Sequence, residues 1–345
     1  MESIFISAWR SFCKTLFSFF GLFVAAGVLL LVIGMFSSPY EMEEKTSIEV
    51  LPDLNNELEI RSMSAPVVLR IDIHGEIGTE FLNTERMQDI LVDSRRGVLG
   101  HGRVKAILLH MDTPGGGVTD SDNIYRMIKA YKAQYNVPVY AYVDGMCASG
   151  GMYISSAADK VYAGPASVVG SVGVRSGPFF NVSDTMGRYG VQAKTLTQGL
   201  DKDMMNPYRP WKPNEDESLM STLSFFYQRF VDIVTAAHPN LNRDKLVNVY
   251  GARVYVGPEA EKLGYVEAAD TDYKTALTDL MQQAKIDPKQ QYQIVQLKPR
   301  IDFFTALSQH SSSFVGKLLS PWIPARLEQR KSEPFLYLYE PGITQ

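Results

Sequence analysis

Apolar runs alternate along this chain with glycine turns and with segments of helical periodicity. Residues 66–74 (PVVLRIDIH) alternate apolar and polar positions, whereas 105–111 (KAILLHM) and 138–143 (PVYAYV) are continuous apolar runs. The alternating segment predicts a strand, and the continuous runs predict strands that are buried on both faces. A glycine turn and a helical segment follow each of these two runs. We therefore expect an α/β domain with mostly parallel strands and crossover helices.

The remaining elements follow from the same patterns. Apolar residues at helical spacing predict a helix capped near Thr119 and Asp120, a helix that begins at Ser149, and a strongly apolar helix at 219–237. Further helices are expected at 84–97, 242–249, 258–263 and 273–285, short strands at 160–163 and 168–174, and one helix and one strand within 181–197.

The N-terminal region carries the longest apolar run. Residues 16–36 contain one polar side chain, Ser18, and are long enough to cross a bilayer core of about 30 Å. The apolar region of a cleaved signal peptide is shorter, about 7–15 residues. We therefore expect an uncleaved transmembrane anchor. Because Arg10 and Lys14 precede this run, the N-terminus is expected in the cytoplasm and the rest of the chain outside.

These patterns predict five parts of the chain. They are a cytoplasmic N-terminus at 1–15, the anchor at 16–36, a polar juxtamembrane linker at 37–64, the main folded domain at 65–285, and a proline-interrupted C-terminal extension at 286–345.

Composition narrows the possible chemistry. The net charge of −4 provides no basic field for nucleic acid. The two cysteines, Cys13 and Cys147, lie in different predicted regions, so we expect neither a disulfide nor a cysteine-based metal site. Metal-ligand spacing is absent among the histidines, so the sequence predicts no metal site and no cofactor. The five histidines are His74, His101, His110, His238 and His310.

Two glycine turns are the first candidates for a functional site. Gly115-Gly116-Gly117 follows the strand at 105–111, and Ser149-Gly150-Gly151 follows the strand at 138–143. If these strands are neighbours, both turns lie at one edge of the sheet, where backbone N–H groups can stabilise an oxyanion. The alternative is that both are only tight strand-to-helix turns. Neither a Walker motif nor G-x-G-x-x-G is present, which argues against phosphate binding.

A serine nucleophile at 149 requires a base. The esterase motif G-x-S-x-G is not met, because Cys147 stands at its first glycine. After Ser149 only His238 and His310 remain, and neither is expected at a strand end. A Ser-His-Asp triad is therefore disfavoured.

A lysine can replace the histidine as base if dry surroundings keep it uncharged. Lys160 lies at the far end of the helix that begins at Ser149 and is expected to open a strand. Lys202, in the loop LTQGLDKDMMNP, is the more promising candidate, although Asp201 and Asp203 flank it.

Four segments together resemble the signal peptide peptidase A (protease IV) family. They are DTPGGGV (112–118), DGMCASGGMYISSAADKVYAGP (144–165), VVGSVGV (168–174) and TQGLDKDMMNP (197–207). The resemblance extends over roughly residues 66–270. It implies a crotonase/Clp-protease-like spiral α/β fold, with 65–285 as the protease domain of a membrane-anchored serine endopeptidase.

The resemblance also implies the roles of individual residues. Ser149 corresponds to the nucleophile, Lys202 to the general base, and Ser171 to the hydroxyl that orients the lysine. Gly116 and Gly150 correspond to the residues whose N–H groups receive the oxyanion.

The setting of the reaction follows from the same resemblance. The expected substrates are peptides, including remnant signal peptides. Neither a nucleic-acid partner nor a cofactor is expected. Members of the family assemble as homo-oligomeric rings, in which the lysine could approach the serine of a neighbouring protomer. The expected location is the bacterial cytoplasmic membrane, crossed once, with the catalytic domain on the periplasmic side.

Two other functions remain open. A crotonase-like enzyme acting on acyl thioesters would use the same glycine turns but would need acidic side chains near them. A catalytically silent scaffold would need none of this chemistry. The presence of Ser149, Lys202 and Ser171 favours the protease.

Overall fold

The computed structural model describes residues 4–36, 45–299 and 335–338. The chain divides into two compact units, Met1–Glu44 and Lys45–Gln345. In the first unit, α1 (Ile4–Phe36) contains a window, Trp9–Leu29, with a hydropathy of 1.9. By length and composition this helix can cross a membrane, and the predicted anchor at 16–36 lies within it.

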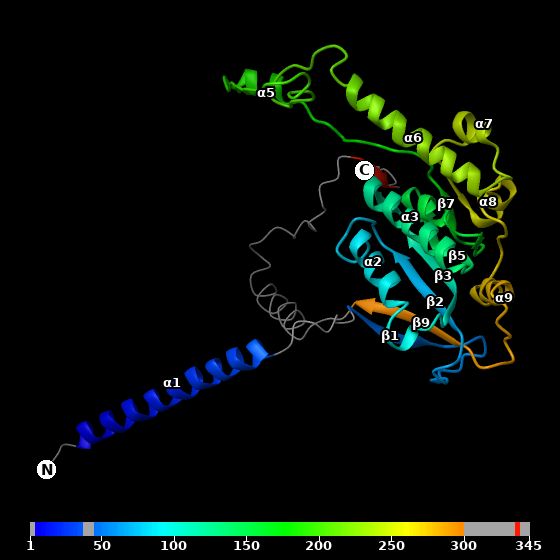
Figure 1. The fold of residues 1–345 in the computed structure, drawn as a ribbon. Coiled ribbons are helices and arrows are strands. Elements are labelled where there is room, and N and C mark those ends of the chain that lie inside the picture. Colours follow the sequence, from blue (N-terminus) through cyan, green and yellow to red (C-terminus); the bar gives the residue numbers. More distant parts are fainter. Residues whose placement is uncertain (1–3, 37–44, 300–334, 339–345) are drawn as a thin grey trace. The chain divides into compact units, whose positions relative to one another are not determined.

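The second unit is built around an eight-stranded sheet (Figure 1). Among the described residues, the strand order is β1-β9-β2-β3-β5-β7-β8, with β6 beside β5. Strands β2, β3, β5, β6 and β7 form parallel pairs, β9 joins β2 in parallel, and β1 and β8 pair antiparallel at the two edges. The predicted α/β fold with mostly parallel strands is confirmed. The strands of this sheet are β1 (Thr46–Leu51), β2 (Val67–His74), β3 (Val104–Thr113), β5 (Val139–Ala148), β6 (Lys160–Ala163), β7 (Val168–Gly170), β8 (Val254–Val256) and β9 (Gln293–Pro299).

Helices cover both faces of this sheet (Figure 1). Helices α2, α3, α4 and α6 pack on one face, and α9 packs on the other. The helices are α2 (Thr84–Asp93), α3 (Val118–Tyr135), α4 (Gly150–Ser155), α5 (Ser183–Arg188), α6 (Glu217–Ala237), α7 (Arg243–Lys245), α8 (Gly257–Leu263) and α9 (Tyr273–Gln283), with a 3₁₀ turn at Gly97–Leu99 and a π-helical turn at Leu246–Tyr250.

Strand β3 is continuously apolar because it is covered on both faces of the sheet. Ile107 and Leu109 belong to the core under α2 and α3, whereas Ala106 and Leu108 belong to the core under α9. Alternate side chains of a strand point to opposite faces, so a strand covered on both sides must be apolar throughout. The prediction of burial on both faces is confirmed for this run.

The predicted domain limits are wrong in two places. Residues 46–51, expected in the linker, form β1, and residues 293–299, expected in the C-terminal extension, form β9 between β1 and β2. Each strand finds its partner more than 200 residues away in the sequence, so no local pattern reveals the pairing. Residues 37–44 of the linker and 300–334 and 339–345 of the extension lie outside the described residues.

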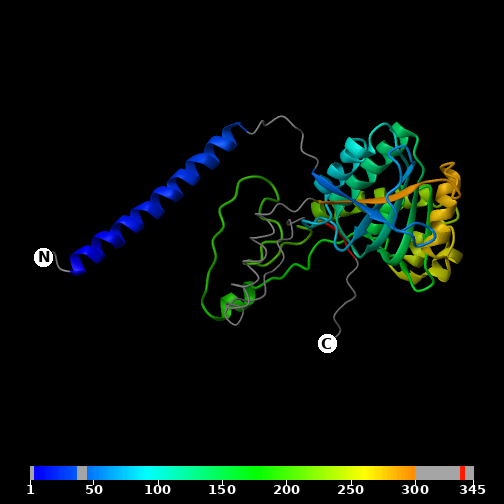
Figure 2. The same cartoon turned by 90° about the horizontal axis from the view of Figure 1, so that it is seen from below.

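Residues 173–229 form an arm that leaves the sheet and returns through α6 (Figures 1 and 2). No residue of this arm is buried. The helix expected within 181–197 is present as α5, but the strand expected there is absent. A strand needs a partner for its N–H and C=O groups, and this part of the arm pairs with no strand in the described part of the chain.

A second, two-stranded sheet joins the C-terminal region to the centre of the fold. Strand β10 (Leu336–Leu338) pairs antiparallel with β4 (Gly115–Gly117). The fully buried Tyr337 stacks against Tyr153, with ring centroids 5.2 Å apart, and lies 4.6 Å from the ring of Phe230. Its hydroxyl donates a hydrogen bond of 2.9 Å to the Phe226 carbonyl. Tyr337 therefore belongs to the core, although it was expected in an extension.

We expect Tyr337→Ala to lower the free energy of unfolding by about 3 kcal/mol or more, because it removes a buried ring and leaves a cavity. Tyr189→Ala is the matched control, since Tyr189 is 81% exposed on the arm. Urea unfolding of the detergent-solubilised chain measures both. Equal losses in the two variants would show that β10 does not contribute to the core.

Candidate active site

The parallel pairing of β3 with β5 brings the two glycine turns together. Thr113, at the end of β3, lies beside Cys147, near the end of β5. A Cβ atom placed on Gly115 would lie 2.7 Å from the backbone nitrogen of Gly150. The prediction that both turns share one edge of the sheet is therefore confirmed.

The first turn is held against the segment that follows β2. Ile77 donates its N–H to the Gly115 carbonyl over 2.8 Å, and Gly117 donates its N–H to the Ile77 carbonyl over 2.9 Å. Gly116, between them, has φ +158°, and a Cβ there would lie 2.0 Å from the Ile77 carbonyl oxygen. Since backbone atoms cannot move aside cheaply, this position requires glycine.

Ser149 stands on a strained turn between β5 and α4. Its φ of +52° with ψ of −113° is uncommon for a residue with a side chain. Its N–H donates to the Gly170 carbonyl over 2.9 Å, and its own carbonyl accepts the N–H of Tyr153. The residue is 1% exposed, and its hydroxyl has no hydrogen-bond partner among the described residues. Strain of this kind is typical of nucleophile turns.

Ser171 occupies the neighbouring position. Ala148 of β5 pairs with Gly170 of β7 in the parallel sheet. Ser149 is the next residue after Ala148, and Ser171 is the next residue after Gly170. Ser171 is also buried and has φ +57°, and its N–H donates to the Arg253 carbonyl over 2.7 Å. Two of the predicted hydroxyls are therefore neighbours in the tertiary structure, although 22 positions separate them in the sequence.

Lys202 is placed differently. It lies on the arm, is exposed, and has no hydrogen bond or ion pair of its ammonium group within the described residues. The neighbouring carboxylate of Asp203 pairs with Arg209 instead, with Nε–Oδ2 at 2.6 Å. The single chain thus does not bring Lys202 into contact with Ser149 or Ser171.

The other bases considered from the sequence have structural partners. Lys160 donates to Asp279 over 2.7 Å, and this hydrogen bond raises the pKa of the lysine. His238 is buried, with Nδ1 3.4 Å from a Glu267 carboxylate oxygen. His310 lies outside the described residues. Neither Lys160 nor His238 is therefore supported as a base for Ser149.

Helix α6 is joined to α4, the helix that follows Ser149, by polar contacts that the sequence did not reveal. Asp122 accepts hydrogen bonds from the hydroxyl of Tyr153, over 2.6 Å, and from Arg229, over 2.6 Å. Burial alone would raise the pKa of Asp122, but these two partners hold it below its ordinary value. The ion pair fixes the base of the arm beside the turn that carries Ser149. No local motif links the three residues, which lie on three different helices.

The edge of the first glycine turn is covered by β10. Tyr337 lies opposite Gly116 in the antiparallel register. A Cβ on Gly150 would meet the Tyr337 carbonyl oxygen at 3.1 Å. An extended backbone therefore lies directly against both glycine turns.

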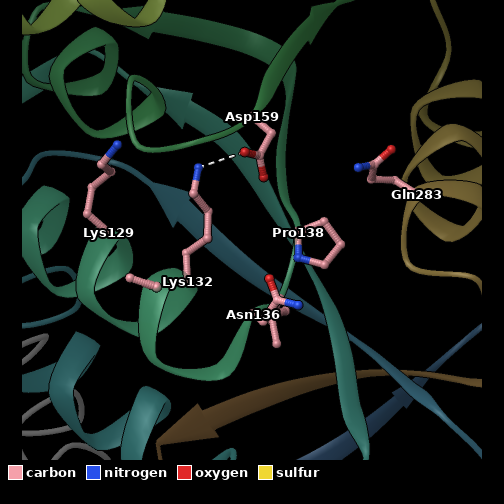
Figure 3. A pocket seen from close by; sticks show the side chains of 8 residues that line it. Lys129, Lys132, Asn136, Pro138, Asp159 and Gln283 are labelled. Atoms are coloured by element: carbon pink, nitrogen blue, oxygen red, sulfur yellow. Dashed lines mark hydrogen bonds and ion pairs between the residues drawn. The ribbon is translucent and has the colours of Figure 1, made fainter.

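A separate hollow lies at the opposite end of the sheet (Figure 3). Lys132, Asn136 and Pro138 line it, and Lys132 pairs there with Asp159 over 2.7 Å. Pro138 precedes β5 and Ser149 follows it, so about ten residues of extended strand, or about 30 Å, separate this hollow from the serine. It is not part of the candidate active site.

Residues 131–287 match peptidase family S49. A putative protease of Methanocaldococcus jannaschii is 33% identical over 183 residues, which cover 53% of this chain and 57% of that protein. A putative signal peptide peptidase SppA of Enterococcus faecium is 27% identical over 318 residues, covering 87% of this chain and 88% of its own. Among solved structures, a ClpP1 mutant of Listeria monocytogenes aligns with a TM-score of 0.39 and 18% identity, covering 60% of this chain and 94% of its own.

We expect Gly116→Ala to abolish catalysis and to destabilise the fold by at least about 1–3 kcal/mol, because the new methyl group meets backbone atoms at a strained φ. Gly187→Ala is the control, since no atom lies within 4 Å of a Cβ at that position in α5. Peptide hydrolysis and thermal unfolding test both variants. Normal activity in Gly116→Ala would contradict the close approach of Ile77.

We expect the Cys147 thiol to resist alkylation in the native protein. Burial raises its pKa to about 12, so on the order of one thiol in ten thousand is ionised at pH 8. The measurement is mass spectrometry after iodoacetamide treatment of Cys13→Ser, with Cys13→Ser/Leu200→Cys as the control because Leu200 is 94% exposed. Rapid native labelling of Cys147 would show that it is accessible and reactive.

Proposed function

Because the chain belongs to the signal peptide peptidase A (protease IV) family of serine proteases, we propose that it is a Ser-Lys endopeptidase anchored in the membrane. Ser149 is the nucleophile, Lys202 the general base, and Ser171 the hydroxyl that orients the lysine. The substrates are remnant signal peptides and other peptides near the membrane.

One observation carries this proposal. Ser149 stands at a strained, buried turn, directly beside a second turn that accepts only glycine. A hydroxyl without a protein partner is free to approach a carbonyl carbon. In this proposal, the N–H groups of Gly116 and Gly150 receive the charge that then develops on oxygen.

The reaction proceeds in two halves. The uncharged amine of Lys202 takes the proton of the Ser149 hydroxyl as its oxygen attacks the peptide carbonyl carbon. The tetrahedral intermediate collapses, the C–N bond breaks, and the lysine returns the proton to the leaving amine. Water then attacks the acyl carbon while Lys202 accepts its proton. The acyl C–O bond breaks, the lysine returns the proton to the Ser149 oxygen, and the acid product leaves.

The exposed position of Lys202 supports a dyad shared between copies of the chain. A lysine base needs dry surroundings to be uncharged, and the single chain does not provide them. The arm that carries Lys202 also exposes large apolar side chains, of which Phe180 is 73%, Leu196 83% and Leu200 94% exposed. Burial of these side chains would favour contact with another copy of the chain. In a homo-oligomeric ring, one protomer's arm would cover the Ser149 region of the next.

Two further features support a peptide substrate at a membrane. Strand β10 shows that the edge of the Gly116 turn accepts an extended backbone, which is the form in which proteases bind peptides. Helix α1 is long and apolar enough to cross a membrane. Arg10 and Lys14 at its N-terminal end favour a cytoplasmic N-terminus, with the protease domain on the periplasmic side of the bacterial cytoplasmic membrane.

Two aspartates that flank the first glycine turn in the sequence do not support acyl-thioester chemistry. Asp112 accepts the Met146 N–H over 3.0 Å, and Asp120 accepts the Thr84 N–H over 2.7 Å. Both are engaged in holding the backbone, whereas a crotonase-like enzyme needs acidic groups free to move protons.

We expect Ser149→Ala and Lys202→Ala each to reduce peptide hydrolysis by at least about 10³-fold without lowering the unfolding temperature, because each removes one half of the dyad. The assay is cleavage of a signal-peptide substrate in detergent. Lys194→Ala, which alters an exposed lysine on the same arm, is the control. Full activity in either dyad variant would remove that residue from the mechanism.

Co-expression of the two inactive variants tests the shared dyad. If Lys202 serves the Ser149 of a neighbour, random mixing rebuilds intact pairs at about a quarter of the sites, and activity returns to that level. If the dyad forms within one chain, no protomer carries both groups and the mixture stays inactive. A third result, activity in each variant alone, would overturn the dyad itself.

A further inference from the structure

Strands β2 and β3 place acidic and imidazole side chains on the same face of the sheet. Asp72 and His74 are two residues apart on β2, and Asp72 pairs in register with His110 on β3. Among the described residues, these three form the one group of His, Cys or acidic side chains that could surround a metal ion, with ligand atoms within 4.8 Å of one another.

The two imidazoles face each other directly. His74 Nε2 lies 2.7 Å from His110 Nδ1. One of these nitrogens must carry a proton and the other a lone pair, unless a cation takes the place of the proton. On the other side of the His74 ring, Nδ1 lies 3.9 Å from Asp72 Oδ2.

Two members of the group, Asp72 and His110, have partners outside it. Asp72 accepts hydrogen bonds from Arg70 and from Gln296, both over 2.6 Å. His110 Nε2 lies 3.4 Å from an Asp144 carboxylate oxygen. Metal ligands in proteins are commonly held in this way, with a carboxylate behind the histidine and donors behind the carboxylate.

The group is buried on one side and open on the other. His110 is 8% exposed and lies beside the rings of Tyr142 and Tyr273, whereas the His74 side chain is 41% exposed. A hollow lined by Asp72, His74 and Gln296 reaches the same point. A solvent-borne ion therefore has a path to the nitrogens, and water can complete its coordination.

We infer that Asp72, His74 and His110 bind one divalent transition-metal ion of the zinc class. Two imidazole nitrogens and one carboxylate oxygen are a ligand set that zinc accepts, with a fourth position left for water. At zinc–nitrogen distances of about 2.0–2.1 Å, tetrahedral geometry separates two ligand nitrogens by about 3.3 Å. Binding therefore requires the two rings to move apart by about half an ångström from their 2.7 Å contact.

The site is coupled to the proposed oxyanion turn through the segment after β2. Gly75 follows His74 and donates its N–H to the Asp112 carbonyl over 2.9 Å, and Ile77 pairs with the Gly115–Gly117 turn. An ion that joins β2 to β3 at this point fixes the end of β2, and with it the position of Ile77. The expected consequence is a more stable protease domain.

The expectation from sequence that the histidines do not cluster is wrong for this pair. His74 and His110 are 36 positions apart. Only the parallel register of β2 with β3 places them together.

The test is zinc binding by the full detergent-solubilised chain after removal of metal with EDTA. Competition with a chromophoric chelator is expected to give one Zn²⁺ per chain, and the unfolding temperature is expected to rise on addition of zinc. Co²⁺ is expected to give the absorption of a tetrahedral site. Asp144→Asn is expected to weaken binding by about 10–100-fold, and His74→Ala to weaken it further.

His101→Ala is the matched control, because His101 is an exposed histidine outside the group. His74→Ala is preferred to a change at buried His110, since His74 is partly exposed and its loss should leave the fold intact. The inference is overturned if the wild-type chain binds no stoichiometric zinc. It is also overturned if a folded His74→Ala chain binds zinc as tightly as His101→Ala. Neither result bears on Ser149 or Lys202, so the proposed protease function stands or falls separately.

Discussion

The parallel pairing of β3 with β5 determines where the two glycine turns of the candidate active site lie. Its register sets Thr113 beside Cys147, and the two strands therefore end together. The glycine turn after one strand and the serine turn after the other then meet at a distance that excludes side chains. If this pairing shifted by one residue, each side chain would change face, and the two turns would no longer share an edge.

The rest of the catalytic region is supported from several directions. The N–H of Ser149 is bound by Gly170 of β7, the Gly116 turn is bound by Ile77, and β10 covers its outer edge. These contacts offset the strain at Ser149, which would not persist in an isolated turn. Lys202 has no such support, because the arm that carries it contains no buried residue. A rigidly held Ser149 and an exposed Lys202 are what the proposed dyad shared between protomers would require.

Segments from both ends of the domain complete this centre. Strand β1 begins shortly after the N-terminal helix, β9 comes from near the end of the chain, and β10 follows it. The face of β2 and β3 that α9 leaves uncovered at their ends is polar. There Asp72, His74 and His110 meet on the two strands whose ends adjoin the Gly115–Gly117 turn. One pair of strands thus serves two chemically different regions of the molecule.

The sequence by itself determined the local elements and the candidates for chemistry. Continuous apolar runs predicted the buried strands β3 and β5, and glycine turns predicted the edge where they end. Local patterns could do this because hydrophobic period and turn chemistry depend on neighbouring residues. The resemblance of four segments to a known family added Ser171 and selected Lys202 among the candidate bases for Ser149. Only the tertiary structure decided that β1 and β9 belong to the main sheet, that Tyr337 belongs to the core, and that two distant histidines touch. These contacts depend on strand register across tens to hundreds of residues, and no local pattern encodes that register.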